Sequence, residues 1–196
     1  MTIDSLPQFV RDVYEIHEWK HACAVLSTDF PKEWAEIIDV LSEFRLRKRH
    51  MLAKGGGKSP VSTAIDSAFY ERGWKAKGFK TKIVIDNTAL ESPTHKVDCF
   101  KNGVALEIEW SNKDPFFDRD LNNFRLLFDL RAISVGVIIT KSDHLRRIME
   151  DLGIWSKYGT TTTWMQKLLP RIEGGGGGGC PILVFGITKK LYIEDC

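Results

Sequence analysis

Three acidic residues, Asp98, Glu107 and Glu109, lie on two short segments that show the alternating pattern of β-strands. The segments are joined at Asn102-Gly103, a pair that favours a two-residue type I′ turn. Counting back along both strands from that turn places Asp98 opposite Glu107, on the face that also carries Glu109. The sequence therefore predicts three carboxylates gathered on one face of a β-hairpin.

Such a cluster has a cost that a bound cation would remove. Like charges opposite one another on neighbouring strands destabilise a hairpin by about 0.2–1 kcal/mol per pair. Ligands that are all oxygen atoms select a hard ion such as Mg²⁺ or Mn²⁺ and not zinc. The alternative is a solvent-facing hairpin whose acidic residues only keep it soluble.

The composition indicates what kind of chain carries this hairpin. It has 196 residues, of which 43% are hydrophobic and 28% charged, as is usual for one globular domain and not for a disordered or fibrous chain. The cysteines Cys23, Cys99, Cys180 and Cys196 show no CxxC spacing and no signal peptide precedes them, which favours reduced thiols in the cytoplasm. No apolar run approaches the roughly 20 residues that cross a membrane, so no membrane segment is expected.

Charge is distributed unevenly along the chain. Residues 43–82 hold 11 basic and 3 acidic residues, whereas the whole chain has a formal net charge of only +2. This asymmetry favours one surface built for a polyanion. The alternative is an ordinary basic helix end exposed to solvent.

The spacing of apolar residues predicts a mixed fold. Helices are expected at 31–44, 60–73, 114–128 and 144–151, within an N-terminal third that is helical throughout, and strands at 82–86, 95–100, 104–110, 132–140 and 181–188. This order predicts an α/β fold with a central mixed β-sheet flanked by helices. We expect a single domain over residues 1–196, comprising an N-terminal helical part at 1–58 and a core at 59–196. The glycine run at 174–179 is expected to form a flexible loop.

The chain resembles a known nuclease family over roughly residues 59–188. The features that carry the resemblance are the acidic hairpin, the helix from Ser59-Pro60-Val61 to Gly73-Trp74-Lys75, the exit Trp110-Ser111-Asn112, and the strands with Val137-Ile138-Ile139 and Leu183-Val184-Phe185-Gly186. Together they resemble the PD-(D/E)xK superfamily, and within it the BamHI, BglII and BstYI group of type II restriction endonucleases. The chain departs from the superfamily pattern in having no proline before Asp98, and in having Glu109 where most members have lysine.

The resemblance implies metal-dependent hydrolysis of double-stranded DNA that leaves 5′-phosphate ends. Asp98, Glu107 and the backbone carbonyl of Ile108 would hold Mg²⁺, for which Mn²⁺ can substitute, and Glu109 would orient or deprotonate the attacking water. Glu71 is a candidate outer metal contact; its alternative role is that of a solvated helix acid. The resemblance also implies a homodimer that cuts a short palindrome, with GATC at its centre.

Residues for DNA binding follow from the same resemblance and from their chemistry. Ser111 and Asn112 directly follow the second acidic strand and are suited to contact base edges; alternatively they only begin the loop before the next helix. Four lysines are better suited to contact phosphates: Lys75, Lys77, Lys80 and Lys82. Two other functions stay open, a catalytically inactive DNA-binding module on the same fold and a repair or structure-specific nuclease.

Two further motifs match known binding sites only in part. Gly57-Lys58-Ser59 is similar to the end of a phosphate-binding P-loop, but the pattern needs glycine where Leu52 stands and a strand before it. His17 and His21 have the spacing of neighbours on a helix and lie near Cys23, yet no fourth metal ligand is identifiable. We expect these histidines to lie on a helix surface or in a dimer contact.

Overall fold

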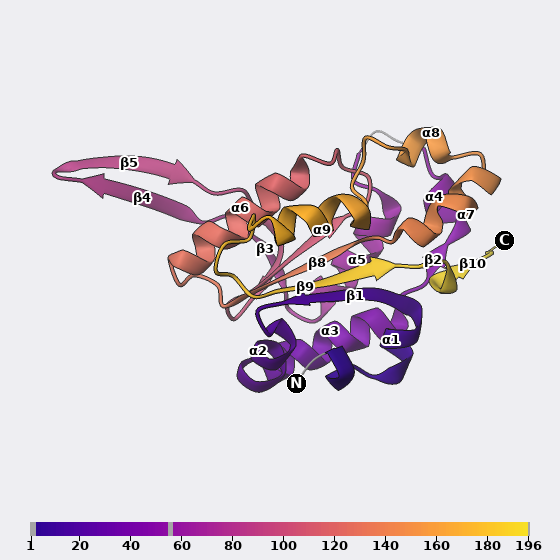
Figure 1. Cartoon of the computed structure of the whole chain (residues 1–196), viewed down its shortest axis with the longest axis horizontal. Coiled ribbons are helices and arrows are strands. Elements are labelled where there is room, and N and C mark those ends of the chain that lie inside the picture. Colours follow the sequence, from indigo (N-terminus) through magenta and orange to yellow (C-terminus); the bar gives the residue numbers. More distant parts are fainter. Residues whose placement is uncertain (1–2, 55–56, 196) are drawn as a thin grey trace.

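A six-stranded mixed β-sheet forms the centre of the molecule in the computed structural model, which describes residues 3–54 and 57–195 (Figure 1). Its strands, in spatial order, are β1 (Tyr14–Trp19), β9 (Ile182–Ile187), β8 (Val135–Lys141), β7 (Val104–Glu109), β6 (Val97–Lys101) and β3 (Lys75–Lys77). The three strands β7, β8 and β9 are parallel, whereas β1, β6 and β3 each run antiparallel to their inner neighbour. The predicted α/β fold with a mixed central sheet is confirmed.

Helices cover both faces of this sheet. The longer ones are α1 (Gln8–Val13), α2 (Ala22–Asp29), α3 (Pro31–Glu43), α5 (Pro60–Glu71), α6 (Phe116–Asp129), α7 (Arg146–Asp151) and α9 (Met165–Glu173), with short α4 (Lys48–Leu52) and α8 (Trp155–Tyr158). One apolar core lies between the sheet and α1, α2, α3 and α5, and a second lies between the sheet and α6 and α9 (Figure 1). Two short strands, β2 (Leu46–Arg47) and β10 (Tyr192–Ile193), pair beside α4.

Local sequence signals account for the helices nearest the acidic hairpin. The Ser59 side chain accepts a hydrogen bond from the Ser62 backbone N–H and Pro60 is the first residue of α5, as predicted. On α6, Phe117, Leu121 and Phe124 are buried at helical spacing, also as predicted. Asp120 and Asn123 are also buried on this helix, although the spacing of apolar residues does not predict polar residues in its buried face.

The expectation that the N-terminal third is helical throughout is wrong. Residues Tyr14–Trp19 form the edge strand β1, which pairs with β9 along its whole length. His17 therefore lies on a strand, where its Nε2 atom is 3.0 Å from Glu15 Oε1, and His21 precedes α2 with a φ of 58°. The alternation of Tyr14 and Ile16 with polar residues was the signal for this strand, and the helices on either side obscured it.

A two-stranded arm projects from the body of the molecule (Figure 1). It is formed by β4 (Lys80–Ile85) and β5 (Thr88–Pro93), which pair only with each other. The strand predicted at 82–86 thus exists but lies outside the central sheet. Val84, Ile85 and Leu90 near its tip are 66%, 58% and 52% exposed, so the arm has no core of its own.

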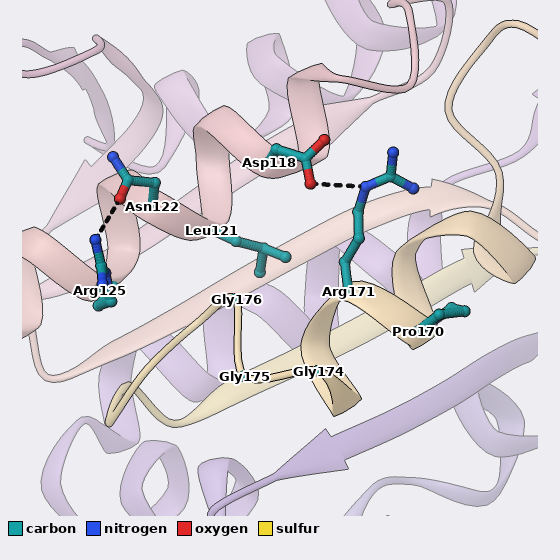
Figure 2. Close-up of a pocket in the computed structure, with 9 residues that line it drawn as sticks. All are labelled: Asp118, Leu121, Asn122, Arg125, Pro170, Arg171, Gly174, Gly175 and Gly176. Carbon is teal, nitrogen blue, oxygen red and sulfur yellow. Dashed lines mark hydrogen bonds and ion pairs between the residues drawn. The ribbon is translucent and has the colours of Figure 1, made fainter.

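The glycine run at 174–179 forms a compact turn between α9 and β9. Figure 2 shows Gly174, Gly175 and Gly176 in a hollow between α6 and α9. These two helices are also joined by an ion pair, in which Arg171 Nε lies 2.8 Å from Asp118 Oδ1. A Cβ atom on Gly177 would come within 2.4 Å of the Ile182 side chain, so the chain packs too closely there for a larger residue. The predicted loop is present; its mobility stays a prediction.

Three of the four cysteines lie in the part of the chain that the structure describes. Cys23, Cys99 and Cys180 are buried free thiols, whereas Cys196 lies outside the described residues. Across residues 3–54 and 57–195, every helix is too short or too polar to cross a lipid bilayer.

The tight contact between β8 and α6 gives a test of the fold. A Cβ atom on Gly136 would lie 2.4 Å from Cδ2 of Phe124, a fully buried ring, so Gly136→Ala should destabilise the protein by about 1–3 kcal/mol. Urea unfolding measures the change. Gly78→Ala is the matched control, because a Cβ atom there meets no atom within 4 Å. Equal midpoints for the two variants would contradict this packing.

Candidate active site

The acidic hairpin has the register that its turn predicts. Asn102 and Gly103 have φ angles of 45° and 90°, as a type I′ turn requires. The pairs that follow are Lys101 with Val104, Phe100 with Ala105 and Cys99 with Leu106. The next position outward brings Asp98 to Glu107.

At this position the two strands are joined through carboxylates. The backbone N–H of Asp98 donates to Glu107 Oε2 at 3.2 Å, and the backbone N–H of Ile108 donates to Asp98 Oδ2 at 3.2 Å. Each acidic side chain therefore binds the backbone of the opposite strand. These two bonds fix the direction of both carboxyl groups relative to the sheet.

Glu107 and Glu109 differ from Asp98 in how deeply they are buried. Their exposed fractions are 0% and 1%, whereas the Asp98 side chain is 31% exposed. Glu107 Oε1 and Glu109 Oε2 are buried without a hydrogen-bond partner. A buried polar atom in this state costs about 1–3 kcal/mol, so the arrangement is unfavourable unless a proton or a cation satisfies these atoms.

A fourth acid, Asp120 of α6, completes the cluster from above the sheet. It is fully buried, and its Oδ1 accepts hydrogen bonds from Arg119 at 2.7 and 2.9 Å. Sequence reasoning did not select Asp120, although the available signal was an acid within the apolar stripe of Phe117, Leu121 and Phe124. Its charge acts on both glutamates.

The environment favours the protonated form of these acids. Burial, followed by the nearby Asp120 carboxylate, raises the pKa of Glu109 to about 9. The same two causes, in the same order, raise the pKa of Glu107 well above its usual value, and burial also raises the pKa of Asp120. A cation bound among them would favour the ionised forms.

Two basic residues border the acids. Arg119 Nη2 lies 3.6 Å from Glu109 Oε1, and its guanidinium lies over the Phe116 ring, 4.1 Å from the ring centroid. Lys58 Nζ forms a close ion pair with Asp66 Oδ2 of α5 and lies 3.9 Å from Asp98 Oδ1. Neither residue was selected from the sequence as part of the site.

Asp98, Lys58 and Arg119 line a cavity of about 320 Å³, whereas Glu107, Glu109 and Asp120 are buried and do not line it. It is lined by Gly57, Lys58, Ser59, Ser62, His95, Asp98, Ile108, Ser111, Asn112, Phe116 and Arg119. The cavity gives an external ligand access to Asp98 and Ile108.

The remaining predicted residues divide between those inside and outside this cavity. Ser111 and Asn112 line it, and Asn112 Nδ2 donates to Glu109 Oε1 at 3.0 Å. Glu71 is exposed at the end of α5 and does not line it; the α5 acid that lies at the site is Asp66. The four lysines also lie outside, with Lys75 and Lys77 on edge strand β3 and Lys80 and Lys82 on the arm.

Comparison with known families identifies the kind of protein that carries this site. A family model described as restriction endonuclease BglII/BglIII matches residues 14–187, which is most of the chain. The chain belongs to this BglII-like family. No individual curated protein matches it.

Membership of the BglII-like family confirms the resemblance seen in the sequence. The protein is a type II restriction endonuclease and acts on DNA. The match begins at the first residue of β1 and ends at the last residue of β9, so it spans the complete central sheet. The buried acids therefore lie within the matched region.

The acidic residues fit a divalent cation chemically, and restriction endonucleases of this family generally depend on one. The donors are carboxylate oxygens, of which Glu107 Oε1, Glu109 Oε2 and Asp120 Oδ2 are buried without a hydrogen-bond partner, and a hard cation prefers oxygen ligands. Within the part of the chain that the structure describes, no three acidic, histidine or cysteine side chains are already arranged around one metal position. Binding would therefore require a rearrangement of side chains that now bond to backbone N–H groups.

The raised pKa of Glu109 predicts how the metal-free protein responds to pH. Between the usual glutamate value of 4.5 and about 9, the folded state holds a proton that the unfolded state has lost. The free energy of unfolding should therefore fall as pH rises through this window, by up to about 1.4 kcal/mol per pH unit for one such group.

Urea unfolding in a chelator at several pH values between 5 and 8.5, roughly, measures this dependence. Glu109→Gln should flatten it, since glutamine has no proton to lose. Glu173→Gln, at an exposed position near the end of α9, is the control and should follow the wild-type curve. Parallel curves for Glu109→Gln and wild type would contradict the raised pKa.

Proposed function

We propose that the protein catalyses Mg²⁺-dependent hydrolysis of phosphodiester bonds in double-stranded DNA at a short palindrome, leaving 5′-phosphate ends. One observation carries this proposal. Glu107 and Glu109 hold buried carboxyl oxygens without partners, and the neighbouring Asp98 lines a cavity that is open to an external ligand. Family membership supplies DNA as that ligand.

The acidic residues would divide the work among them. Asp98, Glu107 and the backbone carbonyl of Ile108 would hold the divalent cation, with Mn²⁺ able to replace Mg²⁺. When bound, the cation would stabilise charge on the scissile phosphate and lower the pKa of the attacking water. Glu71 is kept only as a candidate for an outer contact, because it lies outside the cavity.

Glu109 would act on the attacking water. Its Oε1 accepts from Asn112, so the side chain has a fixed direction, and its buried Oε2 would have to become accessible to that water. A pKa raised to about 9 makes Glu109 a stronger proton acceptor than an ordinary glutamate once it is ionised. In this proposal Glu109 orients the water and takes its proton.

DNA recognition would involve the exit of β7 and the basic edge of the molecule. Ser111 and Asn112 would read base edges, with Asn112 exchanging its bond to Glu109 for one to a base. Phosphate contacts would come from the lysines Lys75, Lys77, Lys80 and Lys82. We further propose a homodimer in the cytoplasm that recognises a palindrome containing GATC.

Glu107→Gln tests the catalytic part of this proposal. It should lower the single-turnover cleavage rate with Mg²⁺ by at least about 100-fold, since it removes a charged oxygen ligand. Binding of the same duplex in Ca²⁺, measured by fluorescence anisotropy, should be retained within a few-fold. Glu173→Gln, outside the cavity, should cleave like wild type. Unimpaired cleavage by Glu107→Gln would exclude the proposed metal site.

Digestion of a sequenced plasmid tests specificity separately. With Mg²⁺, wild-type protein should give discrete fragments whose mapped ends share one palindrome containing GATC. A smear would instead indicate a nuclease without sequence specificity or one that recognises DNA structure. DNA binding without cleavage in either Mg²⁺ or Mn²⁺ would favour an inactive binding module.

A further inference from the structure

Lys58 brings a positive charge to the mouth of the acidic cavity from outside the hairpin. It lies just before α5, and its Nζ atom forms a close ion pair with Asp66 Oδ2 and lies 3.9 Å from Asp98 Oδ1. The Asp66 side chain is only 3% exposed, whereas that of Lys58 is 46% exposed. A buried carboxylate therefore holds an ammonium group that is still open to solvent.

The other basic group at the cavity is already committed to the buried acids. Arg119 donates two hydrogen bonds to Asp120 and lies 3.6 Å from Glu109 Oε1. The pKa of His95 is lowered by burial, which favours the neutral imidazole. Among the described residues that line the cavity, Lys58 is thus the cation best placed to meet an entering anion.

The surroundings of Lys58 also favour an anion. Ser59 and Ser62, at the N-terminus of the 12-residue helix α5, line the same cavity, and this end of a helix carries partial positive charge. An ammonium group has three N–H donors, so Asp66 leaves donors available for a second acceptor. The only acceptor of this kind that the DNA backbone offers in abundance is a phosphate oxygen.

We propose that Lys58 is a catalytic residue that contacts a non-bridging oxygen of the scissile phosphate, and that Asp66 is the positioning residue that holds its ammonium group. This inference rests on the proposed function, since it assumes phosphodiester hydrolysis beside Asp98. The ammonium stabilises the negative charge that develops on the phosphate as the water attacks. Lys58 thus supplies the positive charge that the hairpin lacks, because the hairpin has Glu109 where most members of the superfamily have lysine.

The opposite role is a placeholder. In that case the ammonium would occupy the position of the divalent cation between Asp66 and Asp98 and would leave when the metal binds. The two roles make opposite predictions for the metal affinity of a variant without the ammonium. If Lys58 contacts phosphate, the variant binds the metal as tightly as the wild type does. If Lys58 is a placeholder, the variant binds the metal more tightly than the wild type.

The experiment compares Lys58→Met and Lys58→Arg with wild type in three measurements. Single-turnover cleavage with saturating Mg²⁺ should be about 10²–10³-fold slower for Lys58→Met, with part of the rate recovered in Lys58→Arg. For duplex binding in Ca²⁺, the plot of the logarithm of the association constant against the logarithm of the salt concentration has a negative slope, and its magnitude should be smaller by about 1 for Lys58→Met. Calorimetric affinity for Mn²⁺ without DNA should stay within about two-fold of wild type.

Lys32→Met is the matched control. Lys32 is an exposed lysine in the first turn of α3. Phe30, just before this helix, lies near Gly103, and Gly103 precedes the end of β7 that is opposite to Glu109. It should match wild type in all three measurements. Asp66→Asn should slow cleavage while keeping the salt slope, because the ammonium stays present but is no longer held. Lys58→Arg, which keeps the charge, gives the result if Lys58→Met does not fold.

The outcomes separate this inference from the proposed function. If wild type itself does not cleave DNA, the proposed function fails. If wild type cleaves and Lys58→Met matches it in rate and salt slope, only the role of Lys58 is overturned. Tighter Mn²⁺ binding together with undiminished cleavage by Lys58→Met would show that the ammonium is a placeholder.

Discussion

Two glutamate carboxyl groups lie fully inside this protein, each with one oxygen that no hydrogen-bond donor reaches. A charged group so placed is strongly disfavoured, and the neighbouring Asp120 adds repulsion. Only a proton on these acids or a cation beside them relieves the cost. The metal-free protein takes the first route, as the raised pKa values of Glu107 and Glu109 indicate. Binding of a divalent cation would be the second route, and under the proposed function it would make this arrangement catalytic.

The rest of the fold serves to hold these acids in place. The parallel pairing of β7 with β8 fixes the central strand, and the tight contact of Gly136 with Phe124 brings α6 down onto it. This contact allows Asp120 to reach the hairpin from the opposite layer. On the other side, α5 brings Asp66 and Lys58 to the exposed edge of the cluster. The site thus depends on three separate segments that meet only in the folded chain.

Much of this could be predicted from local sequence, and the failures have a common cause. The Asn102-Gly103 turn fixes the register by short-range geometry, so the position of Asp98 beside Glu107 followed from counting. Asp120, Asp66 and Lys58 are separated from the hairpin along the chain, and their convergence depends on how α5 and α6 pack, which no local pattern specifies. Strand β1 was missed because its partner β9 lies at the far end of the chain. The packing of the glycine turn against α6 escaped for the same reason.

Proton release on metal binding tests the central claim most directly. Since Glu107 and Glu109 prefer their protonated forms, uptake of Mn²⁺ at neutral pH should release protons, about one per carboxyl that becomes ionised. Titration calorimetry in buffers of different ionisation enthalpy measures this number. In the presence of duplex DNA the wild type should release protons, and Glu109→Gln should release fewer. Metal uptake without proton release, or no uptake at all, would contradict the claim that the cation binds beside these buried acids.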